Sequence, residues 1–87
     1  MKLKYEFETT ELGDEIIAVP VGEKSDELHG VLKLNAAGRE ILELLKEETT
    51  EEAIVEALAA KYENDRKELA GYVHKFAEEL AQKGLLV

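Results

Sequence analysis

The stretch that decides the fold spans residues 34–42, Leu34-Asn35-Ala36-Ala37-Gly38-Arg39-Glu40-Ile41-Leu42. It follows an apolar, strand-like run and has the pattern of a beginning helix. Asn35 suits the N-cap position because its side-chain carbonyl can accept a hydrogen bond from a backbone N–H that the helix leaves unpaired. One helical stripe then carries the apolar residues Ala37, Ile41, Leu42 and Leu45. The chain is therefore expected to change from strand to helix at Asn35.

Upstream of Asn35 the sequence predicts three strands. Residues 3–8 alternate between apolar and charged side chains, which is the period of a half-buried strand. Gly13-Asp14 has turn chemistry, and the β-branched, apolar run at 16–19 predicts a second strand. Pro20 donates no backbone hydrogen bond, so this strand is expected to end there or to lie at a sheet edge. After a polar loop, residues 28–34 predict a third strand.

Downstream of the first helix the sequence predicts two more. Thr49-Thr50-Glu51-Glu52 fits a capping box, with Thr49 as the N-cap and Glu52 reaching back to it. Asp65 marks the start of the last helix, and Gly84 stands where a left-handed residue would end it. The two apolar stripes are Ile54, Leu58 and Tyr62, then Leu69, Val73, Phe76 and Leu80. Three strands followed by three helices favour a single α+β domain over residues 1–87.

Charge and composition exclude several classes of function. The 87 residues include 20 acidic and 11 basic side chains, for a formal net charge of −9. Duplex nucleic acid is bound mainly by Lys and Arg, so free nucleic acid is not an expected partner. No apolar run approaches the roughly 20 residues of a membrane span. The absence of Cys excludes a disulfide framework and a thiolate metal site, and a reducing cytoplasm is the simplest location.

Residues suited to catalysis or metal binding are sparse. His29 and His74 are the only imidazoles, whereas a two-His metal site on one helix needs them about four residues apart. Ser25 is the only serine and has no base nearby in the sequence. The six glycines are scattered and form no phosphate-binding loop. We therefore expect no enzyme activity, no cofactor and no metal.

The segment from Gly30 to Leu34 is the candidate binding segment. A small sheet has open edges, and proteins usually protect them with charge, proline or bulges. Val31 and Leu32 are apolar, and only Lys33 carries a charge. Two interpretations remain open: a central strand with no binding role, or an edge to which a peptide adds as a further strand through backbone hydrogen bonds.

Several motifs together resemble one known family. They are the strand leading into Leu34-Asn35, the helix with Ile41-Leu42 and Leu45, the Thr49-x-x-Glu52 cap and the ending Val73-x-x-Phe76…Leu80…Gly84-Leu85-Leu86. In order and spacing this chain is similar to the PqqD family, the pyrroloquinoline quinone synthesis D proteins and their relatives, the RiPP recognition elements. The resemblance implies a winged helix-turn-helix, with a three-stranded antiparallel sheet packed against three helices.

The resemblance also implies a function. Members bind the leader segment of a ribosomally made precursor peptide as an added strand and present it to a modifying enzyme, often a radical S-adenosylmethionine protein. Carried onto this chain, the peptide-binding residues are Gly30, Val31, Leu32, Lys33 and Leu34 on the edge, and Arg66, Leu69, Ala70, Tyr72 and Val73 on the last helix. Tyr72 stands where many relatives have Asp. The expected protein is a monomer or weak dimer that binds neither nucleic acid nor membrane; the alternative is a winged-helix domain that binds nucleic acid or serves transcription.

Overall fold

A computed structural model describes residues 1–22 and 31–87 of the chain. Most of the expected polar loop and the beginning of the expected third strand, including Gly30 and His29, lie outside these ranges. Three antiparallel strands in the order β1-β2-β3 precede three helices, as the sequence predicted. The elements are β1 (Glu6–Leu12), β2 (Glu15–Val21), β3 (Leu32–Leu34), α1 (Ala36–Leu44), α2 (Glu51–Ala59) and α3 (Arg66–Gln82).

The β1–β2 hairpin turns at Gly13, whose positive φ of 64° favours glycine. β1 begins later than the expected strand at 3–8, and Leu3 instead forms an isolated bridge with Leu86. β2 ends at Val21, so the expected end at Pro20 is met to within one residue, whereas the alternative of an edge strand is wrong because β2 is the central strand. Proline is tolerated because the described pairing of β2 with β3 covers only 16–18.

Side-chain caps define where the helices begin. Asn35 Oδ1 accepts from the Gly38 N–H at 2.8 Å, which confirms the expected cap of α1. For α2 the cap is Thr50, whose Oγ1 accepts from the Ala53 N–H at 3.1 Å, so the expected capping box starting at Thr49 is wrong by one residue. The Thr49 N–H donates instead to the Met1 carbonyl at 2.9 Å, because the N-terminal segment packs there.

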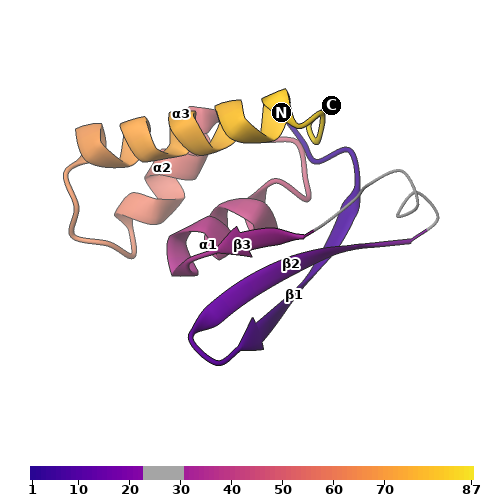
Figure 1. The fold of residues 1–87 in the computed structure, drawn as a ribbon. Coiled ribbons are helices and arrows are strands. Elements are labelled where there is room, and N and C mark those ends of the chain that lie inside the picture. Colours follow the sequence, from indigo (N-terminus) through magenta and orange to yellow (C-terminus); the bar gives the residue numbers. More distant parts are fainter. Residues whose placement is uncertain (23–30) are drawn as a thin grey trace.

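The last helix, α3, has the caps that the sequence predicts. Asp65 accepts from the Lys67 N–H at 2.9 Å, and Gly84 has a φ of +73° after the helix ends. The chain termini then meet: the Val87 N–H donates to the Lys2 carbonyl at 2.8 Å, and Figure 1 shows both ends side by side.

The core lies between the sheet and the helices, which gather on one side of the strands (Figure 1). Its fully buried large side chains are Ile41, Leu45, Ile54, Leu58 and Val73. The expected stripe of α3 is confirmed at Leu69, Val73 and Leu80. Phe76 is different, because it is only partly buried at the border of the core while its neighbour Ala77 is buried.

Candidate functional site

The first part of the site is the open edge of β3. Within the residues that the structure describes, β3 pairs with β2 alone, so its opposite edge has no described partner. Leu32 and Leu34 pack partly against the core, whereas Lys33 is exposed on the other face of the sheet. An edge of this kind presents backbone N–H and C=O groups that can pair with an added strand.

The second part is an apolar wall beside that edge, which we define as Leu32, Leu34, Tyr72 and Phe76. Tyr72 and Phe76 lie one turn apart on α3, with ring centroids 6.3 Å apart and an angle of 42° between the ring planes. All four side chains are partly buried against the core and partly open to solvent. Side chains of an added strand would alternate, and every second one would face this wall.

Gly38 allows the elements of the wall to approach one another. A Cβ at Gly38 would lie 3.1 Å from Phe76 Cε2 and 3.5 Å from Leu34 Cβ. Contacts near 3.1 Å are too close for a carbon atom without a shift of its neighbour. The absence of a side chain at Gly38 therefore lets β3, α1 and α3 meet where the wall is formed.

A hydrogen bond ties α3 to the end of β3. The Tyr72 hydroxyl donates to Asn35 Oδ1 at 3.0 Å, and the same oxygen accepts from the Gly38 N–H at 2.8 Å. The N-cap of α1 therefore also fixes the position of a residue on α3. Tyr72 is thus the residue of the apolar wall that is bonded to Asn35, which directly follows β3.

The residues that the family resemblance assigned to α3 lie on different surfaces of the helix in the structure. Tyr72 joins the wall, but Val73 is fully buried and Leu69 is 8% exposed, so both belong to the core. Arg66 and Ala70 face the other way and line a cavity between α2 and α3. On the edge, Leu32, Lys33 and Leu34 form β3 itself, and exposed Val31 precedes it.

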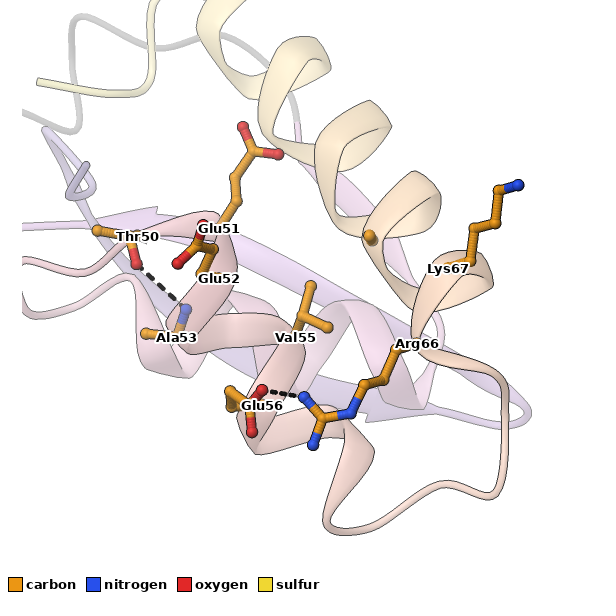
Figure 2. A pocket seen from close by; sticks show the side chains of 9 residues that line it. Thr50, Glu51, Glu52, Ala53, Val55, Glu56, Arg66 and Lys67 are labelled. Atoms are coloured by element: carbon orange, nitrogen blue, oxygen red, sulfur yellow. Dashed lines mark hydrogen bonds and ion pairs between the residues drawn. The ribbon is translucent and has the colours of Figure 1, made fainter.

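Figure 2 shows Arg66 among the residues that line the cavity between α2 and α3. Its guanidinium reaches from the start of α3 to the carboxylate of Glu56 on α2, while Lys67 points away. The hydrogen bond from Arg66, with its positive charge, lowers the pKa of Glu56. Arg66 therefore joins two helices on the side of α3 that faces α2.

Two residues of the site were missed by reasoning from the sequence. Phe76 was assigned to the core, and Asn35 was assigned only a capping role. The signal for Phe76 was its spacing of four residues from Tyr72, which places both on one helix face. No sequence signal indicates that Asn35 also accepts from Tyr72, because the two residues are 37 positions apart.

His74 is exposed on α3 and lies between two carboxylates. Its Nδ1 is 3.1 Å from Glu51 Oε1, and its Nε2 is 3.5 Å from Glu78 Oε2. Among residues 1–22 and 31–87, no group of three or more His, Cys, Asp or Glu side chains is arranged to hold a metal ion. No helix in this part of the chain is long and apolar enough to cross a membrane.

Comparison with known proteins confirms the resemblance seen in the sequence. The model of the family described as coenzyme PQQ synthesis protein D (PqqD) matches residues 21–86, and this chain belongs to that family. Among solved structures it is similar to TbiB1 in complex with the TbiA(beta) leader peptide. That similarity has a TM-score of 0.71 and 29% identity, over 99% of this chain and 94% of TbiB1. No curated protein matches this chain.

Proposed function

We propose that this protein binds the leader segment of a ribosomally made precursor peptide by adding it as a strand to the open edge of β3. The observation that carries the proposal is the position of that edge directly beside the apolar wall. Backbone pairing would hold the peptide, and the wall would select every second side chain. The likeness to TbiB1, a structure that holds a leader peptide, supports this assignment.

The expected affinity follows from the kind of ligand. A leader peptide is disordered before it binds, and its ordering offsets part of the interaction free energy. A dissociation constant near 1 μM, about −8 kcal/mol, is a reasonable value for such a segment. It is weak enough for the peptide to be released after modification.

In this proposal the protein is a binding module that acts with a separate modifying enzyme of the radical S-adenosylmethionine class. It catalyses no step itself and works in the cytoplasm as a monomer or weak dimer. Membership of the PqqD family supports this role. The pathway would be quinone synthesis or the maturation of another peptide.

Chemical-shift mapping tests where the peptide binds. The probe is a candidate leader peptide, titrated into ¹⁵N-labelled protein. Amide shifts should concentrate in 31–35 and 72–76. Shifts centred on α2 would contradict the proposal, as would binding that leaves β3 unaffected.

A gel-shift assay tests the nucleic-acid alternative. With a formal charge of −9, the protein should not retard duplex DNA even at low salt, where phosphate contacts are strongest. Tight binding that weakens steeply with salt would favour a winged-helix nucleic-acid-binding domain. The same preparation should bind the leader peptide, which provides the positive control.

A further inference from the structure

A cavity of about 350 Å³ lies on the other side of Tyr72 from Phe76, beyond the end of β3. Its volume is in the range of small-ligand pockets. Neither Phe76 nor any residue of β3 lines it, so the cavity adjoins the apolar wall and shares only Tyr72 with it. The lining combines the buried apolar side chains Leu58 and Leu69, the two rings Tyr62 and Tyr72, and the polar residues Asn64 and Glu68.

Glu68 is the one charged residue that lines this cavity among the described parts of the chain. It is exposed and makes no ion pair with another described residue. Lys61 binds both carboxylate oxygens of Glu40 at 2.9 Å and Arg66 binds Glu56, while Lys67 lines the separate cavity against α2. The cavity therefore offers an unneutralised carboxylate beside two tyrosine rings.

Helix capping explains only part of this arrangement. Glu68 lies in the first turn of α3, where a carboxylate complements the helix dipole. The dipole does not require two tyrosines to face the same cavity, nor a floor made of Leu58 and Leu69. The cavity has an apolar floor, aromatic sides and an acidic rim. These features match a side chain with an apolar stem and a cationic end.

We propose that this cavity binds an arginine side chain of the leader peptide. The stem would lie over Leu69, while the guanidinium would stack on the tyrosine rings and donate to Glu68. Arginine fits better than lysine because its planar guanidinium stacks on rings, donates in pairs to a carboxylate and is more weakly hydrated. The inference rests on the proposed function for the identity of the ligand.

The place of the cavity fixes where the arginine would occur in the peptide. Asn35 directly follows β3 and also lines the cavity. A strand added along β3 would leave the apolar wall at this point. The arginine would therefore lie just beyond the leader residues that pair with β3, on the Leu34 side.

The test uses Nα-acetyl-arginine amide as the probe and its neutral isostere, Nα-acetyl-citrulline amide, for comparison. Titrated into ¹⁵N-labelled protein, the arginine amide should shift the amides of Tyr62, Asn64, Glu68 and Tyr72. The citrulline amide should bind about fivefold more weakly, because it cannot form the ion pair. Glu68→Gln should remove this difference between the two probes.

Glu52→Gln is the matched control. Glu52 is also an exposed first-turn glutamate, but it lies on α2 outside this cavity, so the variant loses the same charge and dipole complement. It should retain the preference for arginine. Equal binding of the two amides, or the same loss of preference in both variants, would overturn the inference. If the cavity shows no preference for arginine while the leader still binds at β3, the inference fails and the proposed function stands. If the cavity prefers arginine but no leader binds, the proposed function fails instead.

Discussion

Phe76→Ala should affect both stability and peptide binding, because Phe76 belongs to the apolar wall and to the border of the core. Replacing a fully buried Phe by Ala costs about 3–5 kcal/mol. Phe76 is only partly buried, so we expect a loss of about 2 kcal/mol, roughly half of that range. With a urea m-value near 1 kcal/mol/M for a domain of this size, the midpoint should fall by about 2 M.

Phe7→Ala provides the comparison. Phe7 is 7% exposed, lies on β1 and does not line the wall, so its loss should cost the full 3–5 kcal/mol. Circular dichroism is the suitable probe of unfolding, because the chain has no tryptophan. Among folded molecules, Phe76→Ala should weaken leader binding at least tenfold, whereas Phe7→Ala should leave the affinity unchanged.

Two results would refute this reasoning. Equal stability losses for Phe76→Ala and Phe7→Ala would show that Phe76 is an ordinary core residue. Unchanged leader affinity in folded Phe76→Ala would show that the peptide does not use the wall. His74→Ala on the same helix should alter neither property strongly, because His74 is exposed and faces Glu51 of α2.

Two further predictions concern the helices. Thr50→Ala should lower the free energy of unfolding by about 1 kcal/mol, because it removes the cap of α2, while Thr49→Ala should change it by much less. A larger loss for Thr49→Ala in urea unfolding would show that Thr49 is the cap. Glu56 should titrate below its ordinary pKa, because the Arg66 hydrogen bond and charge favour the carboxylate. Because folding lowers the pKa of Glu56, its pair with Arg66 stabilises the fold at pH values above the ordinary carboxyl pKa. This stabilisation is lost as the pH falls through the pKa of the folded state. Arg66→Gln should raise the pKa of Glu56 toward its ordinary value in a carboxyl ¹³C titration, and an unchanged pKa would contradict the ion pair.

Local sequence chemistry predicted the parts of the fold that depend on neighbouring residues. The Asn35 cap, the turn at Gly13 and the positive φ of Gly84 follow from the side chain, or its absence, at those positions. Thr49 and Thr50 are chemically identical, so local rules could not choose between them. The choice is made by a long-range contact, in which the Thr49 N–H binds the Met1 carbonyl.

The candidate site was predictable on β3 but not on α3. Periodicity located the buried stripe through Leu69 and Val73, yet it could not say which flank of that stripe faces β3. Tyr72 and Phe76 lie on one flank, whereas Arg66 and Ala70 lie on the other, against α2. The assignment of the whole first half of α3 to peptide binding therefore combined residues from two different surfaces. The packing of α3 on α2 and α1, which the sequence pattern does not encode locally, separates them.

Hydrogen exchange at β3 tests the central claim most directly. In an antiparallel ladder, successive N–H groups point alternately toward one neighbour and away from it, so some amides of β3 bond to β2 and the rest face the open edge. In the free protein the edge-facing amides of residues 32–34 should exchange rapidly. With the leader peptide at saturation, strand addition predicts that these amides become at least tenfold more protected, while exchange in α2 stays unchanged. Bound leader that leaves every β3 amide exchanging at its original rate would contradict strand addition at this edge.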